Sequence, residues 1–396
     1  MTAYKQTELG LIPSDWEVVE LGNLFEINAG GDLNKNIFSL IKTHEHIYPV
    51  YSNAITNNGL YGFLKSYDYD GEYLTVTARG YIGYSVARNG KFSTIGRLLT
   101  LKPKNNISCY LASEYINEFV NFAIESTGVP QLTAPQIAKY SIIIPKSITE
   151  QTAIATALSD TDALLAELEK LLAKKQAIKT ATMQQLLTGK TRLPEFAHRA
   201  DGTPKGSLKT EWGDIPEDWE VVALGEYVNI FDNQRIPVSA SNRIFGNIPY
   251  YGANGIQDYV NGFTHDGEFV LVAEDGANDL INYPVQYTTG KIWVNNHAHV
   301  LQGKKNILCN KFLAYCISSM NISHYLVGGT RAKLNGSTLK QIEILCPQYK
   351  EQTAIAQILG DMDSEIKALQ AQIEKLREIK QGMMQNLLTG KIRLPC

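Results

Sequence analysis

The chain has 396 residues, which is long enough for two or three domains. Its composition, 44% hydrophobic and 19% charged, supports substantial cores and argues against a disordered protein. The formal net charge of −3 excludes a simple polycationic nucleic-acid coat, and the polar N-terminus without any membrane-length apolar run predicts a cytoplasmic protein.

One unit of about two hundred residues is written twice in the sequence. The opening segment IPSDWEVV, residues 12–19, returns as IPEDWEVV at residues 215–222, an offset of 203. Two later segments return at an offset of 201: Glu150–Ala155 as Glu351–Ala356, and Leu186–Lys190 as Leu387–Lys391. The middles of the copies match only in islands. A shared scaffold with two differently specialised surfaces explains this pattern, and drift of a decorative domain would explain it too.

Each copy begins with a segment rich in Gly, Asn and Tyr that carries short β-type runs separated by turn-forming pairs. The runs are residues 72–77 and 141–145 in the first copy and 268–272 and 341–345 in the second, with short helices near 111–124 and 311–319. This pattern predicts a compact α+β globule with many surface loops in each copy.

Each copy ends in a long predicted helix without proline, residues 150–187 and 351–388, which spans ~57 Å at 1.5 Å per residue. Apolar residues recur at alternating four- and three-residue spacing, which indicates a heptad seam and helices that pack on each other. The seam residues are Leu158, Leu165, Leu168 and Leu172 in the first helix and Leu359, Met362, Ile366, Leu369, Ile373 and Leu376 in the second. A second stripe, Leu164, Leu171 and Ile178, widens the apolar face of the first helix.

These signals predict five segments. They are a first globular domain at residues 1–148, a first helical region at 149–192, a Pro/Gly-rich connector at 193–212, a second globular domain at 213–348 and a second helical region at 349–396. Glycines at 189 and 390 are expected to end the two helices as left-handed caps.

No catalytic constellation stands out in the sequence. Gly189-Lys190-Thr191 lacks the earlier glycine of a phosphate-binding loop and follows a helix, so a helix cap is the better interpretation. The histidine pairs at 44/46 and 297/299 have spacings unlike helical zinc ligands, which favours solvated or core histidines. The five cysteines form no Cys-x-x-Cys pair, and no metal site is predicted.

The edges of the repeat resemble a known family. Residues 10–17 (GLIPSDWE) and 213–220 (GDIPEDWE) resemble the opening of each target-recognition domain in Type I restriction–modification specificity subunits. The segments EQTAIA at 150–155 and QQLLTGK at 184–190 resemble the helical spacer regions of that family. The resemblance covers essentially the whole chain, in the expected order and twice.

This resemblance implies a non-catalytic subunit without a cofactor of its own that binds double-stranded DNA and holds two modification subunits. Those partners would methylate adenine with S-adenosylmethionine, and restriction subunits, where present, would cleave DNA with ATP and Mg²⁺. Each recognition domain would read one half of a bipartite, asymmetric target. The two antiparallel helices, a coiled coil in this family, would set the spacing between the half-sites and dock the modification subunits.

Base reading needs polar side chains on loops that can enter a groove. The candidates are Tyr51, Ser52, Asn53, Arg79, Thr127 and Gln131 in the first domain and Gly252, Asn254, Asn278, Arg331 and Lys333 in the second. Arg79 directly follows a predicted strand, and the loop at 328–333 is glycine-rich and basic, so its backbone can approach phosphates. An ordinary surface loop is the alternative for each. The acidic net charge departs from a typical DNA-binding protein, so local basic patches and partner subunits are expected to neutralise the phosphates.

Two other functions compete with this interpretation. A self-contained nuclease or methyltransferase with duplicated lobes is disfavoured because its catalytic motifs are missing from the sequence. A coiled-coil scaffold whose two globules bind protein or glycan, without a DNA role, agrees with the pI near 6.2. The bases that each domain would recognise are not encoded in any simple residue-to-base rule.

Inserting four residues into one long helix is expected to lengthen the helix by ~6 Å. The preferred spacer between the half-sites should then grow by one or two base pairs, since a DNA turn of ~10 base pairs spans ~34 Å. Sequencing of methylated sites measures both the spacer and the half-sites. Unchanged spacing, or altered half-sites, would contradict the idea that the helices act as a ruler.

Overall fold

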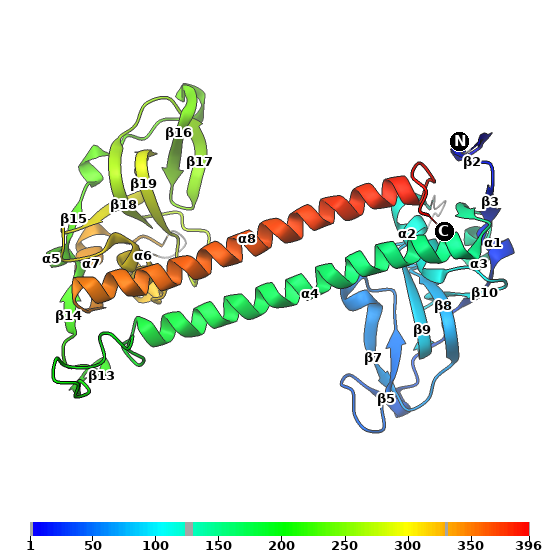
Figure 1. Ribbon diagram of the computed structural model, residues 1–396, viewed down its shortest axis with the longest axis horizontal. Helices are drawn as coiled ribbons and strands as arrows, with labels where there is room; N and C mark the ends of the chain where they lie inside the picture. Colours follow the sequence, from blue (N-terminus) through cyan, green and yellow to red (C-terminus); the bar gives the residue numbers. More distant parts are fainter. Residues whose placement is uncertain (1–2, 123–129, 329–331, 396) are drawn as a thin grey trace. The chain divides into compact units, whose positions relative to one another are not determined.

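The computed structural model describes residues 3–122, 130–328 and 332–395 (Figure 1). The chain divides into two compact units that interleave in sequence. Unit 1 comprises Met1–Lys170 with Ala371–Cys396, and unit 2 comprises Leu171–Gln370. Each long helix therefore begins in one unit and ends in the other.

Unit 1 contains a seven-stranded sheet with the strand order β4-β10-β8-β9-β6-β7-β5. Neighbouring strands pair antiparallel, except β6 and β9, which run parallel. Helix α2 packs on β8 and β9, and its N-cap residue is Ser108, whose side chain accepts a hydrogen bond from the backbone N–H of Leu111. The elements of unit 1 before the long helix are β1 (Tyr4–Thr7), β2 (Gly10–Pro13), β3 (Trp16–Glu20), α1 (Leu21–Leu24), β4 (Phe25–Ala29), η1 (Lys35–Ile37), β5 (Phe38–Ser39), β6 (Tyr48–Tyr51), η2 (Thr56–Gly59), β7 (Leu60–Leu64), β8 (Tyr69–Val76), β9 (Ser85–Thr94), β10 (Leu99–Pro103), α2 (Cys109–Phe119), α3 (Ala134–Ile137) and β11 (Ser141–Pro145).

Unit 2 repeats this plan with a six-stranded sheet in the order β15-β20-β18-β19-β16-β17. Strands β16 and β19 again form the parallel pair, and helix α6 takes the place of α2 against β18 and β19. Its elements are β12 (Ser207–Thr210), β13 (Gly213–Pro216), β14 (Glu220–Ala223), α5 (Leu224–Tyr227), β15 (Val228–Ile230), η3 (Asp232–Gln234), η4 (Ala240–Asn242), β16 (Phe245–Gly252), β17 (Gly255–Val260), β18 (His265–Ala273), β19 (Val285–Val294), β20 (Ala298–Gly303), α6 (Asn310–Ser318), η5 (Ile322–Tyr325), α7 (Gly336–Gln341) and β21 (Glu343–Cys346).

The two long helices are α4 (Ile148–Leu186) and α8 (Tyr349–Leu387). In unit 1 the start of α4 and the end of α8 share one core, which includes Leu158 and Met384 (Figure 1). In unit 2 the end of α4 and the start of α8 share another, which includes Leu186 and Leu359. Since the start of one helix meets the end of the other in both units, the helices pack antiparallel. The predicted α+β class with an internal repeat and two long antiparallel helices is confirmed.

The seam residues are buried or half-buried along both helices, and Leu369 and Ile373 are 8% and 4% exposed. The second stripe behaves differently from the expectation. Leu164, Leu171 and Ile178 are 49%, 41% and 45% exposed. This stripe therefore faces solvent and does not widen the buried face.

Lys179 of α4 and Lys380 of α8 take up seam positions beyond the leucines, and each of them forms ion pairs there. In unit 2, Lys179 Nζ lies 2.5 Å from Asp363 Oδ1. In unit 1, Lys380 Nζ lies 3.0 Å from Glu114 Oε2 and 2.7 Å from Asp162 Oδ1. Each lysine thus ties its helix to an acidic residue of its own unit.

A buried lock joins the repeated edge motifs in unit 2. Glu351, at the start of α8, accepts hydrogen bonds from Trp219 Nε1 at 3.2 Å and from Arg192 Nε at 2.7 Å. Arg192 Nη1 also donates to Asp218 Oδ1 at 2.8 Å. Desolvation opposes ionisation of Asp218, but hydrogen bonds from Arg192 and Lys205 outweigh it and lower the pKa of Asp218 to about 2.

Unit 1 contains the same lock, made by the equivalent residues of the repeat. Trp16 Nε1 donates to Glu150 Oε2 at 3.2 Å, and Arg393 binds Glu150 and Asp15. Glycine is required beside both locks. Gly189 and Gly390 have φ of +68° and +70°, and a Cβ on either would lie 2.5 Å from a proline ring of the same unit.

Removing Arg192 should destabilise unit 2 by ~3–5 kcal/mol, because Arg192→Ala leaves the carboxylate of Glu351, which is 1% exposed, without its cation. The matched control is Arg377→Ala, since the Arg377–Glu169 pair of unit 1 is about half exposed on both sides and should contribute at most ~1 kcal/mol. Denaturant unfolding monitored by tryptophan fluorescence measures both variants. Equal losses would contradict the assignment of Arg192 as a structural lock.

Candidate nucleic-acid interface

Three loops meet at one end of the main sheet in each unit, and we call them the reading edge. In unit 1 they are residues 51–59 after β6, 77–84 after β8, and 130–132. In unit 2 they are residues 252–255 after β16, 274–284 after β18, and 327–334, of which 329–331 lie outside the described residues. The third loop is held in the same way in both units. The N–H of Leu132 donates to the carbonyl of Ala78 at 2.9 Å, and that of Leu334 donates to the carbonyl of Glu274 at 2.8 Å.

Asn53 is the central tie of the reading edge in unit 1. Its Oδ1 accepts a hydrogen bond from the N–H of Ala78 at 2.6 Å, and its Nδ2 donates to the carbonyl of Gly96 at 2.6 Å. Both polar atoms of the Asn53 side chain, a predicted base reader, are therefore hydrogen-bonded to the backbone of two loops. Such a tie holds the loops at a fixed separation, which suits a positioning role.

Arg79 and Gln131, two predicted readers, form a pair on this edge. Arg79 Nε and Nη2 donate to Gln131 Oε1 at 3.0 Å and 2.6 Å. The guanidinium is exposed at the surface, so its remaining N–H groups are free of the protein core. A planar fork already aligned by a neutral amide is arranged to donate two hydrogen bonds to one partner, as guanine recognition requires.

The remaining predicted readers of unit 1 are partly covered. Tyr51 lies beneath the guanidinium of Arg88, with 3.7 Å between the Arg88 Cζ and the ring centroid. Ser52 donates its N–H to the carbonyl of Gly59 at 2.8 Å. Arg88 is 9% exposed and donates to the carbonyl of Asn58 at 2.5 Å, and burial lowers its pKa. These contacts shape the loop at 51–59 from below. Thr127 lies outside the described residues.

Asn254 plays the part of Asn53 in unit 2. Its Oδ1 accepts a hydrogen bond from the N–H of Asn278 at 2.9 Å, and its Nδ2 donates to the carbonyl of Gly276 at 2.9 Å. Asn254 is exposed, and Asn53 is half-buried. Gly252 is buried where β16 turns into β17, and a Cβ there would lie 2.2 Å from the amide nitrogen of Gln257. Gly252 thus contributes close packing of the turn, and no side chain that could read a base.

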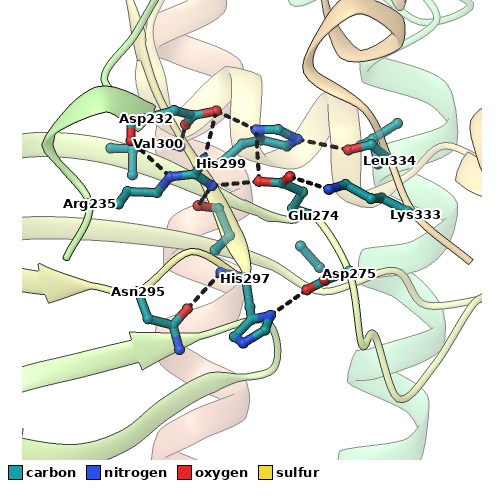
Figure 2. Close-up of polar contacts among 12 residues, drawn as sticks. Asp232, Arg235, Glu274, Asp275, Asn295, His297, His299, Val300, Lys333 and Leu334 are labelled. Atoms are coloured by element: carbon teal, nitrogen blue, oxygen red, sulfur yellow. Dashed lines mark hydrogen bonds and ion pairs between the residues drawn. The ribbon is translucent and has the colours of Figure 1, made fainter. Parts of the chain in front are cut away.

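An ion network underlies the reading edge of unit 2 (Figure 2). Lys333, a predicted reader, places its Nζ 2.9 Å from Glu274 Oε1, and Arg235 Nη1 lies 2.6 Å from Glu274 Oε2. Desolvation opposes ionisation of Glu274, but hydrogen bonds from Lys333 and Arg235 outweigh it and lower its pKa. Arg331, the other predicted reader of this loop, lies outside the described residues.

Asp232, Glu274 and His299 lie close enough together to suggest a metal site. Their ligand atoms are already taken by protein groups, since Arg235 and Lys333 bind Glu274 and His299 binds Asp232. Two cations beside the carboxylates would also repel a metal ion. The cluster is better explained as an internal ion network than as a metal centre.

Several residues of the reading edge, or of the segments that contact it, were not predicted from the sequence. In unit 1 these are Asn58, which accepts a hydrogen bond from the Tyr84 hydroxyl at 2.9 Å, and the exposed residues Tyr81 and Arg97. In unit 2 they are Asp232, Arg235, Glu274 and His299. The partners of the network are separated by up to 67 residues in the chain, so no local spacing signals them.

Comparison with known proteins decides the family. The family model of the type I restriction modification DNA specificity domain matches residues 13–180 and 216–378, which is most of the chain and once per copy. The chain belongs to the type I restriction–modification specificity family. As a specificity subunit, it confers DNA sequence specificity, and the predicted function is confirmed at this level.

Two relatives and one solved structure illustrate the match. A putative type I restriction enzyme specificity subunit of Haemophilus influenzae is 53% identical over 136 residues, which is 34% of this chain and 35% of the relative. The putative type I restriction enzyme MjaX specificity subunit of Methanocaldococcus jannaschii is 28% identical over 99% of this chain and 97% of its own. The crystal structure of the type I restriction–modification S subunit from M. genitalium shares the fold, with a TM-score of 0.68 at 15% identity over 94% of this chain and 96% of that one.

Among the described residues, no helix combines the length and the apolar character that crossing a membrane demands.

Arg79→Ala should relax base discrimination at one half-site by ~1–3 kcal/mol, about 5- to 150-fold, if Arg79 donates both hydrogen bonds to guanine. Arg79→Lys should lose nearly as much, because an ammonium cannot reproduce the planar fork. Lys102→Ala, an exposed residue of β10, is the control. Methylation-site sequencing gives the preference at each half-site, and an unchanged motif for Arg79→Ala would rule this role out.

Proposed function

We propose that each unit of this specificity subunit reads one half of a bipartite, asymmetric DNA target through its reading edge. The observation that carries the proposal is that both edges share one backbone frame but present different side chains. Where unit 1 places Arg79 and Gln131, unit 2 places Asp275 and Lys333 at the equivalent backbone positions. Equal frames with unequal side chains are what two different half-sites require.

The chain supplies recognition, and we propose that two modification subunits supply the chemistry. In this proposal they bring S-adenosylmethionine and methylate adenine, and restriction subunits, where the cell has them, bring ATP and Mg²⁺. The stripe of exposed apolar residues on α4 supports a docking role for the helices. Leu171 and Ile178 stand one heptad apart on the same face of α4, and this exposed apolar pair offers a surface for a partner to cover.

A non-catalytic role is part of the proposal. The titratable groups of the reading edge are engaged with each other, as in the Glu274–Arg235–Lys333 contacts, and such pairing suits structure better than proton transfer. The buried cysteines Cys316 and Cys346 have raised pKa values, because burial disfavours their thiolates, which argues against nucleophilic use of them.

The alternative is a scaffold whose two globules bind protein or glycan without a DNA role. The net charge of −3 is the observation in its favour. The reading edges do present exposed amides and guanidinium groups, which are donors that nucleic acids accept.

The decisive experiment co-expresses the chain with a type I modification subunit from the same genome and maps methylated adenines by sequencing. A bipartite motif with two different halves, present only with both chains, is the expected result. The purified chain alone, incubated with DNA and labelled S-adenosylmethionine, should transfer no methyl group. Methylation without this chain, or by this chain alone, would refute the proposal.

A further inference from the structure

His299 is a buried polar group beneath the reading edge of unit 2, with a side chain 2% exposed. Both of its ring nitrogens have partners. Nδ1 lies 2.5 Å from Asp232 Oδ2, and Nε2 lies 2.8 Å from the carbonyl oxygen of Leu334 (Figure 2). A carbonyl only accepts, so Nε2 must donate, and an ionised Asp232 likewise needs a donor at Nδ1. The contacts therefore match a doubly protonated imidazolium.

The network anchors the base of the third loop of the reading edge. Val327 and Lys333, on the two sides of residues 329–331, exchange backbone hydrogen bonds, each 2.9 Å long. The next residue, Leu334, is bound on both sides, since its N–H donates to the carbonyl of Glu274 and its carbonyl accepts from His299. Lys333 is held again through its side chain by Glu274. His299 itself contacts Leu334 and lies 3.8 Å from Glu274, the residue that binds both Lys333 and Leu334.

Asp232 connects the network to the sheet. Its Oδ1 accepts the N–H of Val300 at 2.8 Å, while its Oδ2 binds His299 and lies 3.5 Å from Arg235. Arg235 in turn donates to the carbonyl of Ala298 at 2.8 Å. The base of the loop is thus bound to β20 of the main sheet, because His299 is a residue of β20 and Asp232 binds the backbone of the same strand. These contacts restrain the position of the loop base.

In unit 1 the positions equivalent to His299 and Glu274 hold uncharged residues. Strand register equates His299, opposite Val272, with Leu99, opposite Val76. The position of Glu274 is taken by Ala78, whose carbonyl binds the N–H of Leu132. Leu99 and Ala78 are 1% and 0% exposed, so this floor is apolar. The fold does not need the network, which therefore serves something particular to unit 2.

Resting on the proposed function, we infer that His299 is a positioning residue that fixes Lys333 and Leu334, the described base of the third loop, for reading of the half-site recognised by unit 2. Its replacement loosens the loop base and lowers base discrimination at that half-site. The reading edge of unit 1 has its own apolar support and is not affected.

The charged groups that face His299 are Asp232, Arg235, Glu274 and Lys333. Burial disfavours the imidazolium, but the hydrogen bond to Asp232, the carbonyl of Leu334 and the nearby Glu274 outweigh burial and raise the pKa of His299. A raised pKa means that the anchoring is complete at low pH and is lost as pH rises through the pKa of the folded state.

The test uses the purified complex of the full chain with its modification subunit. Substrates are duplexes carrying the motif mapped for the wild type, with single base changes in either half, and the readout is the ratio of methylation rates. His299→Gln should lower discrimination about tenfold or more at one half-site only. That half-site should not be the one changed by Arg79→Ala. His324→Gln, an exposed histidine of unit 2, is the control and should change neither half.

Asp232→Asn separates positioning from general damage. Asparagine can accept from Val300 and donate to a neutral His299, so discrimination should stay near the wild-type value and become independent of pH. In the wild type, discrimination at the same half-site should fall as pH rises. Equal losses at both half-sites, no loss at either, or complete loss of methylation with His299→Gln would overturn the inference. If the wild type yields no bipartite motif, the proposed function itself fails.

Discussion

The structure depends on one buried carboxylate at the start of each long helix. Glu150 and Glu351 are 4% and 1% exposed, and each collects a tryptophan N–H and an arginine guanidinium from segments far away in the sequence. A buried charge is tolerable only when such partners surround it. Each lock therefore forces the opening of a domain, one helix start and the tail of the other helix to meet, and it makes two compact units out of one continuous chain.

Much of the fold could be predicted because its signals are local or repeated. Proline-free stretches with heptad spacing indicate the two long helices, and left-handed glycines mark where they end. The stripe at Leu171 and Ile178 could not be placed in the same way, because apolar character alone does not tell a buried face from one that awaits a partner. The role of the lysines in the seam could not be predicted either, because the acidic residues that pair with them belong to other elements.

The reading edge was harder to predict, for a physical reason. Residue type identified Asn53 and Asn254 as candidates, but only the structure shows that both spend their amides on backbone groups of neighbouring loops. Hydrogen bonding between distant loops follows from strand order, which periodicity does not reveal. The role of these candidates as base readers stays a prediction, and it concerns groups left exposed above the ties.

The contrast between the two floors limits how the halves can be re-engineered. A loop moved from unit 2 to the equivalent place in unit 1 would lie over Leu99 and Ala78. Neither residue offers a carboxylate to pair with the lysine of the loop. Grafting a new preference onto this scaffold therefore means transplanting the support together with the loop. Asp232, Glu274 and His299 would have to be transferred with the loop. A chimera without them would contain the correct loop residues but would not hold them in the correct conformation.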